Sequence, residues 1–167
     1  MTRPLAERLL DIARGRGLMI ATAESCTGGM VAAAITDIPG SSTIYDRGAV
    51  TYSNAAKSDM LGVPAELIAR HGAVSEPVAR AMAAGILDRS GADLAVATTG
   101  IAGPGPSEHK PEGRVCFGLA VRGGDVATET VEFGALGRDT VRLEATRHAL
   151  RLLIRAALKG AGPKGPA

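Results

Sequence analysis

The sequence predicts an α/β fold, a three-layer α/β/α sandwich around a mixed, mostly parallel five-stranded sheet. Short apolar runs alternate with amphipathic helical patterns through the first two-thirds of the chain, as in a sheet covered on both faces. Two runs, Leu94 to Thr99 and Val115 to Val121, are almost continuously apolar, which is typical of strands buried on both faces. A Gly123-Gly124-Asp125 turn before the last strand indicates a closing hairpin, and this makes the sheet mixed.

In the first half of the chain we expect a helix and then two strands, each followed by a helix. Apolar residues at helical spacing precede the first strand, and turn residues precede the second. In order, the expected elements are a helix carrying Leu5, Leu9 and Ile12, a strand from Leu18 to Ala21, a helix reaching Thr36, a strand from Gly48 to Tyr52, and a helix capped by Asn54 that carries Ala55 to Leu61.

In the second half, Ser75-Glu76-Pro77 is a strong helix start, and the helix that follows is expected to reach about Ser90. After the two apolar strands, residues Ala127 to Phe133 alternate in polarity and predict an edge strand antiparallel to its neighbour. A last helix is expected from about Asp139 to Leu158. We expect one domain over residues 1–159 and a flexible tail over residues 160–167, where glycine and proline dominate.

Composition narrows the classes of function. Aromatic residues make up only 2% of the 167 residues, so the chain offers few of the rings on which single-stranded nucleic acids stack. The net charge of +2 favours a small anionic ligand over a polyanion. The two cysteines form neither a metal-ligand spacing nor a disulfide framework. With no apolar segment of export or membrane-spanning type, we expect a cytoplasmic protein without nucleic-acid or membrane partners.

The stretch Thr22-Ala23-Glu24-Ser25-Cys26-Thr27-Gly28-Gly29 joins the first strand to the helical pattern that reaches Thr36. A serine at such a junction is expected near helix-start amides and the positive end of the helix dipole, which favour negative charge. Gly28 and Gly29 permit close approach of a ligand. Ser25 is therefore a candidate nucleophile. The alternative role for Ser25 is that of a helix N-cap.

Two further reactive groups follow the second strand, where Tyr52 ends the strand and Lys57 begins the next helix. If the two strands are parallel neighbours, their carboxyl ends share one edge of the sheet, and Ser25, Tyr52 and Lys57 can converge there. A lysine acts as a general base only when desolvation or nearby positive charge lowers its pKa. The alternatives are a solvated helix lysine for Lys57 and a packing residue for Tyr52.

A glycine-rich loop, Thr98-Thr99-Gly100-Ile101-Ala102-Gly103-Pro104, follows the buried strand at the same edge. Its amides are candidates for binding a phosphate, although an ordinary loop has the same composition. Arg138 and Arg142 lie one turn apart at the start of the last helix and add positive charge there, unless they form only a solvated face. Cys26 is an alternative nucleophile to Ser25, because a thiol is intrinsically more nucleophilic and a helix start lowers its pKa. Adjacent residues of a turn point in different directions, so only one of the two can face the cleft.

These segments together resemble the C-terminal domain of the competence-damage-inducible CinA proteins, and more closely its stand-alone form, the nicotinamide-nucleotide amidohydrolases. The resemblance runs from about Leu5 to about Leu158. It is carried by residues 22–29 and by four further motifs: Asp37-Ile38-Pro39-Gly40-Ser41-Ser42, Val50-Thr51-Tyr52-Ser53-Asn54, His71-Gly72-Ala73-Val74-Ser75-Glu76-Pro77-Val78 and Thr99-Gly100-Ile101-Ala102-Gly103-Pro104.

The resemblance implies hydrolysis of the carboxamide of nicotinamide mononucleotide to nicotinic acid mononucleotide and ammonia, a step of pyridine nucleotide salvage. It implies a serine-lysine amidase without a metal or other cofactor, in which Ser25 attacks the amide, Lys57 moves the proton and Tyr52 orients or relays between them. Amides near Thr27 and Gly28 would stabilise the oxyanion. The remaining implied substrate contacts, at the phosphoribosyl end, are Thr99, Gly100, Ile101, Ala102, Gly103 and Arg142.

The resemblance also implies a homo-oligomer, most simply a dimer. The chain departs from the family pattern in the loop over 104–113, where Pro106 interrupts the position of a Gly-Gly pair and the loop is one residue shorter. Two other functions stay open at this point. One is a non-catalytic nucleotide-binding or regulatory module, and the other is the same amidase reaction with Cys26 as the nucleophile.

Overall fold

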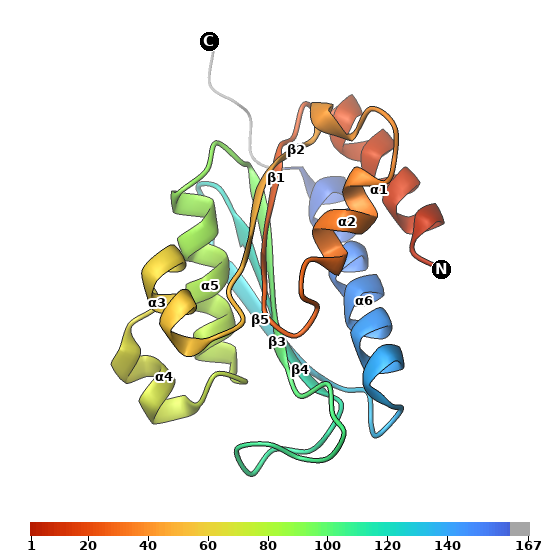
Figure 1. Cartoon of the computed structure of the whole chain (residues 1–167). Coiled ribbons are helices and arrows are strands. Elements are labelled where there is room, and N and C mark those ends of the chain that lie inside the picture. Colours follow the sequence, from red (N-terminus) through yellow and green to blue (C-terminus); the bar gives the residue numbers. More distant parts are fainter. Residues whose placement is uncertain (161–167) are drawn as a thin grey trace.

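The fold is a five-stranded sheet between two layers of helices, as the sequence predicts (Figure 1). The computed structural model describes residues 1–160, so the tail predicted for 160–167 lies outside the described residues except for Gly160. The strands lie in the order β2-β1-β3-β4-β5. Their bounds are Ile20–Glu24 for β1, Tyr45–Val50 for β2, Leu94–Gly100 for β3, Arg114–Val121 for β4 and Val126–Glu132 for β5.

The sheet is mixed because the chain first winds in parallel and then closes with a hairpin. Strand β1 pairs in parallel with β2 and β3, whereas β4 is antiparallel to both β3 and β5. Only β4 therefore runs against the other four strands. The predicted edge strand is confirmed as β5, and the carboxyl ends of β1, β2 and β3 open on one edge, at the bottom of Figure 1.

Helices α1, α2 and α6 cover one face of the sheet, and α3, α4 and α5 cover the other (Figure 1). Their bounds are Arg3–Gly15 for α1, Met30–Thr36 for α2, Asn54–Leu61 for α3, Ala65–His71 for α4, Glu76–Asp88 for α5 and Arg138–Lys159 for α6, with a short 3₁₀ turn over Ser41–Thr43. None of the helices in residues 1–160 combines the length and the apolar character that crossing a membrane requires.

The central strand β3 serves both layers because its side chains alternate between two buried clusters. Leu94 and Val96 belong to the cluster beneath α1, α2 and α6. Ala95 and Ala97 belong to the cluster beneath α5, where small side chains let that helix approach closely. The uninterrupted apolar run in the sequence has this physical cause, since both faces of β3 are covered.

Three local predictions need correction. Strand β1 extends to Glu24 and β2 ends at Val50, so both are displaced from the predicted ranges. Helix α2 begins only at Met30, after a turn over residues 25–29, because Gly28 and Gly29 adopt left-handed backbone angles. The short helix α4 was not predicted, because a single turn or two of helix leaves little periodicity in a sequence.

Candidate active site

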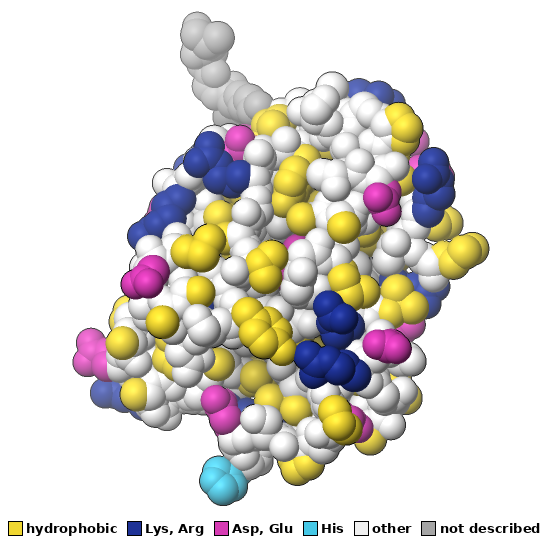
Figure 2. All heavy atoms as spheres, in the orientation of Figure 1, with side chains coloured by type: hydrophobic (Ala, Val, Ile, Leu, Met, Phe, Trp, Pro, Cys, Tyr) yellow, Lys and Arg dark blue, Asp and Glu magenta, His cyan; other side chains and the backbone are white. Residues whose placement is uncertain are grey.

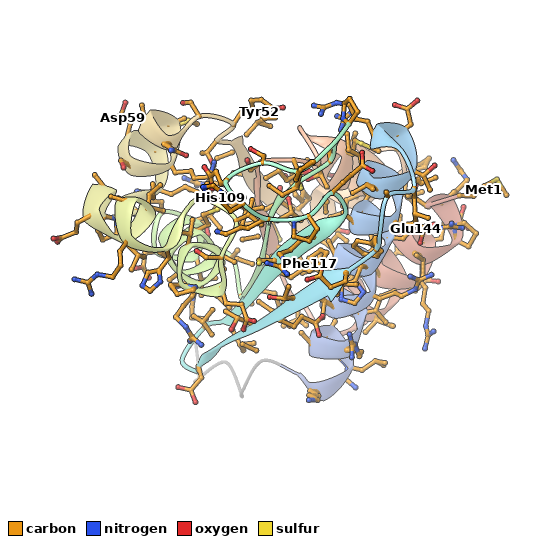
Figure 3. The ribbon with its side chains drawn as sticks, turned by 90° about the horizontal axis from the view of Figure 1, so that it is seen from below. Met1, Tyr52, Asp59, His109, Phe117 and Glu144 are labelled. Atoms are coloured by element: carbon orange, nitrogen blue, oxygen red, sulfur yellow. The ribbon has the colours of Figure 1, made fainter. Side chains whose placement is uncertain are left out.

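A cavity of about 300 Å³ opens at the edge of the sheet where β1, β2 and β3 end. This volume is in the range of small-molecule sites. Figure 3 looks onto this edge and labels Tyr52, which follows β2, and His109, which lies in the loop after β3. The lining residues are Ser25, Cys26, Tyr52, Asn54, Lys57, Ala73, Val74, residues 99–108 and Arg138.

Ser25 and Lys57 meet inside this cavity. Lys57 is only 1% exposed, and its Nζ donates to Ser25 Oγ at 3.2 Å. The same Nζ donates to the main-chain oxygens of Thr51, at 2.9 Å, and Tyr52, at 3.3 Å. Desolvation by burial lowers the pKa of Lys57, and the electrostatic effects of Cys26 and Glu108 oppose this more weakly. The pair therefore has the contact and the environment that a serine with a lysine base requires.

The sheet itself fixes the positions of this pair. Ser25 N donates to Thr98 O at 2.9 Å, and Thr51 N donates to Glu24 O at 2.8 Å, so the parallel ladders continue one residue past β1 and β2. Lys57 follows in α3, whose N-cap is Ser53 and not Asn54 as predicted, since the Ser53 hydroxyl accepts from Ala56 N. The ladders thus fix Ser25 and Thr51, and the bonds of Lys57 Nζ to the main-chain oxygens of Thr51 and Tyr52 hold the lysine beside them.

Glu24 caps the start of α2. It lies in the motif over residues 22–29, but the sequence predicted no role for it. The Glu24 carboxylate is buried and accepts from Val31 N at 2.9 Å, Ala32 N at 3.0 Å and Thr27 Oγ1 at 2.6 Å. Its own charge therefore occupies the anion-favouring end of the helix. An acid placed directly at the end of an apolar strand, before a glycine pair, was the signal in the sequence.

This arrangement corrects the predicted role of the helix-start amides. Ser25 is not the N-cap of α2, because Gly29 occupies that position. The amide of Gly28 donates to Ser25 O at 3.0 Å, so it is not free to receive an oxyanion in this conformation. Within residues 1–160 the amide of Thr27 donates to no backbone or side-chain acceptor, and it stays a candidate for that role.

Tyr52 contacts the pair through its backbone and not through its phenol. The side chain is 62% exposed, and its hydroxyl accepts from Arg138 Nη2 at 3.0 Å. Arg138 Nη1 also donates to Gly103 O at 2.7 Å. The structure thus places the Tyr52 hydroxyl against Arg138 and not against Ser25 or Lys57.

Arg138, not Arg142, is the arginine that lines the cavity. Arg142 points into the turn after β1, where its Nε donates to Cys26 O at 3.0 Å and its Nη2 lies 3.5 Å from Thr27 O. Two nitrogens of the Arg142 guanidinium are thus directed at these carbonyl oxygens, and its predicted substrate contact stays a prediction. Arg138 precedes Arg142 by one helical turn, and only Arg138 lies at the cavity.

The loop after β3 lines the cavity as predicted, with Thr99, Gly100, Ile101, Ala102 and Gly103 all on its wall. Part of its hydrogen-bonding capacity is already used. Thr99 Oγ1 donates to Ala73 O at 2.9 Å, and Ile101 N donates to Arg114 O at 2.8 Å. These two groups are therefore already engaged within the protein, and phosphate binding by the loop stays a prediction.

Cys26 also borders the cavity, but its side chain belongs to the buried apolar cluster beneath α6. Burial raises the pKa of the Cys26 thiol to about 12, mainly through desolvation. The thiol is therefore protonated near neutral pH, and the nucleophilic thiolate is scarce. Among the described residues, no group of three or more histidine, cysteine, aspartate or glutamate side chains could hold a metal ion.

Comparison with known proteins places the chain in a family. The model of the CinA C-terminal domain matches residues 2–157. The chain belongs to the CinA C-terminal domain family. Two solved CinA structures share the fold: the competence/damage inducible protein CihA of Agrobacterium tumefaciens, at 49% identity, and KP700603 of Klebsiella pneumoniae, at 38%. Their TM-scores are 0.89 and 0.91, and the matches cover 92% and 96% of this chain and 94% and 99% of theirs.

Relatives of this CinA domain differ in length. Nicotinamide-nucleotide amidohydrolase PncC of Escherichia coli K12 is 51% identical over 150 residues, which are 89% of this chain and 90% of PncC. The putative competence-damage inducible protein of Symbiobacterium thermophilum is 55% identical over 84% of this chain and 35% of its own length. The CinA-like protein of Mycolicibacterium gilvum is 57% identical over 87% of this chain and 34% of its own length. The chain thus spans about a third of these two longer relatives.

Proposed function

We propose that this CinA domain hydrolyses the carboxamide of nicotinamide mononucleotide to nicotinic acid mononucleotide and ammonia, in pyridine nucleotide salvage. One observation carries the proposal: Lys57 Nζ lies 3.2 Å from Ser25 Oγ on the wall of a cavity of about 300 Å³. The name of the Escherichia coli relative, nicotinamide-nucleotide amidohydrolase, supports the choice of substrate class, because that protein matches this chain along 90% of its length.

In the proposed reaction Lys57 is a neutral amine, which accepts from the Ser25 hydroxyl instead of donating to it. A neutral Nζ has two N–H bonds and one lone pair. The carbonyl oxygens of Thr51 and Tyr52 accept the two N–H bonds, which leaves the lone pair to face the Ser25 hydroxyl. The contribution of Tyr52 to catalysis is then its main-chain oxygen, which fixes the orientation of the base.

The reaction follows from this arrangement. Ser25 Oγ attacks the carboxamide carbon as its proton passes to Lys57 Nζ, and negative charge develops on the carboxamide oxygen. Lys57 then returns the proton to the amide nitrogen, the C–N bond breaks and ammonia leaves. Water next attacks the resulting ester while Lys57 takes a proton from it. The C–Oγ bond breaks, Ser25 regains its proton, and nicotinic acid mononucleotide is released.

The other candidate functions have less support. A version with Cys26 as nucleophile would need a thiolate, and burial opposes its formation. A module that only binds nucleotides would not need a lysine buried against a serine hydroxyl, since desolvating a lysine costs free energy. On the face shown in Figure 2, basic and acidic side chains are interspersed, without the continuous basic stripe that a polyanion favours.

Release of ammonia from nicotinamide mononucleotide tests the proposal, with Ser25→Ala, Lys57→Met and Cys26→Ala compared with the wild-type chain in the presence of a chelator. We expect the first two substitutions to lower kcat by about 10³-fold or more, because each removes a partner of the proton transfer. Cys26→Ala should stay within about threefold of wild type, since it removes one small buried group.

Each contrary result points to a different function. Full activity in Ser25→Ala together with an inactive, folded Cys26→Ala would identify the cysteine reaction. Saturable binding of the mononucleotide by the wild-type chain without ammonia release would identify a binding module. Activity that the chelator abolishes would show that a metal takes part.

A further inference from the structure

The loop after β3 carries a charged residue that the reaction above does not use. Its tip is a tight hairpin, in which Ser107 N donates to Lys110 O at 3.0 Å and Lys110 N donates to Ser107 O at 2.8 Å. Lys110 Nζ ties this hairpin to the segment between α4 and α5, donating to His71 O at 2.8 Å and Val74 O at 2.6 Å. The tip is thus held over the cavity wall that this segment forms.

The backbone of the hairpin is strained where it presents Glu108. Glu108 and His109 have φ values of 52° and 62°, in the left-handed region that is unfavourable for a residue other than glycine. Glycine or asparagine would relieve this cost at the tip of such a turn. Backbone strain is concentrated at functional sites, so the side chains of this strained loop are candidates for a role at the cavity.

The two strained residues have different surroundings. Glu108 lines the cavity, whereas His109 does not. The Glu108 carboxylate lies against Gly72, where a Cβ would come within 2.8 Å of Glu108 Oε2 and 2.6 Å of Lys110 Nζ. Because Gly72 has no side chain, the Glu108 carboxylate and the Lys110 ammonium can both pack against it.

Glu108 gives the cavity an uneven distribution of charge. Among the lining residues the charged side chains are Lys57, Glu108 and Arg138, so Glu108 is the acidic one. Arg138 begins α6, on one face of the sheet, while Glu108 rests against the α4–α5 segment on the other face. The lining thus places Arg138 on one side of the cavity and Glu108, with Lys57 of α3, on the other, so its one acidic side chain lies across from Arg138. This arrangement suits a ligand with separated charges of both signs.

We propose that Glu108 is a specificity-determining residue whose carboxylate faces a positively charged aromatic ring of the ligand, while Arg138 faces its anionic end. This inference rests on the proposed function, in which the ring that bears the carboxamide is a pyridinium and the far end is a phosphate. Glu108 then selects carboxamides on a cationic ring over carboxamides on a neutral ring of the same shape. The reduced, dihydropyridine form of the mononucleotide is the natural neutral probe, because reduction removes the ring charge with little change in size.

Calorimetry tests this in the Ser25→Ala background, which prevents turnover during the titration. The dissociation constants of the oxidised and the reduced mononucleotide are measured with and without Glu108→Gln. For a partly exposed pair of charges we expect affinity for the oxidised form to fall about threefold to fivefold, with no change for the reduced form. Asp59→Asn is the matched control for net charge, since Asp59 is exposed on α3 and does not line the cavity (Figure 3).

Several outcomes would overturn the inference. Equal weakening of both ligands by Glu108→Gln would show that the residue only shapes the loop, and no change for either would show that its charge is not sensed. An equal effect of Asp59→Asn would reduce the result to overall charge. Failure of the proposed function is separate: a wild-type chain that binds the oxidised form without releasing ammonia would refute the amidase, while the Glu108 comparison would still decide the ring preference.

Discussion

At the scale of single residues, Lys57 decides how the site works. Its Nζ is surrounded by a hydroxyl and two carbonyl oxygens, with no carboxylate in contact, so little compensates for the loss of water. The pKa of Lys57 is therefore lowered mainly by desolvation. A larger share of this lysine than of an exposed one is neutral near physiological pH, and in the proposed reaction that neutral share is the base.

The rate should consequently depend on pH through Lys57. The neutral base increases as pH rises, so we expect kcat/KM to rise with pH and to level off below the ordinary lysine pKa of 10.5, because the pKa is lowered. A pH profile of ammonia release checks this. Cys26→Ala should keep the same profile, since the thiol titrates only near pH 12. Loss of the rise in Cys26→Ala would assign it to the cysteine instead.

Residue types at the ends of strands were predictable, but the directions of their side chains were not. Ser25 and Lys57 lie in contact because parallel strands end at a common edge, which follows from topology alone. The contacts of the Tyr52 hydroxyl with Arg138 and of the Arg142 guanidinium with Cys26 could not be predicted, because the path of the chain after a strand and the rotation of a helix about its axis leave no trace in the sequence. Arg138, one helical turn earlier, took the position at the cavity.

At the scale of elements, the turn between β1 and α2 depends on the buried charge of Glu24. Its carboxylate accepts from two amides and one hydroxyl, and Thr27 Oγ1 is in turn 2.8 Å from Thr98 Oγ1. This network joins the start of α2 to β3 and holds Ser25 between them. The turn that presents Ser25, the proposed nucleophile, is thus built around an acid that does not line the cavity.

Glu24→Gln tests this dependence. Glutamine replaces one acceptor oxygen by an amide donor that faces other donors, so we expect a loss of about 1–3 kcal/mol of unfolding free energy, measured in urea, together with lower kcat. Glu7→Gln is the control, because Glu7 forms only an exposed i,i+4 pair with Arg3 and should cost about 0.5 kcal/mol or less. Equal effects of the two substitutions would show that the Glu24 charge is not needed.

At the scale of the whole molecule, the layers were predictable because alternation and burial are properties of long segments. The uninterrupted apolar runs identified β3 and β4, and the hairpin turn identified the edge strand. The cavity was not predictable in the same way, since it needs the end of β1, the start of α3, the loop after β3 and the start of α6 at once. The homo-oligomer expected from the family resemblance stays a prediction.

The close packing of α5 against β4 can be tested by substituting Gly118. A Cβ at Gly118 of β4 would overlap the main-chain oxygen of Ala79 in α5, and neither backbone can move without shifting its layer. We expect Gly118→Ala to lower the unfolding free energy by about 1–3 kcal/mol. It should also raise KM, because α5 positions the Ala73 and Val74 wall of the cavity. At Gly91 a Cβ meets open space. Thermal unfolding should therefore distinguish Gly118→Ala from a nearly neutral Gly91→Ala, and equal melting temperatures would mean that the layers can separate at little cost.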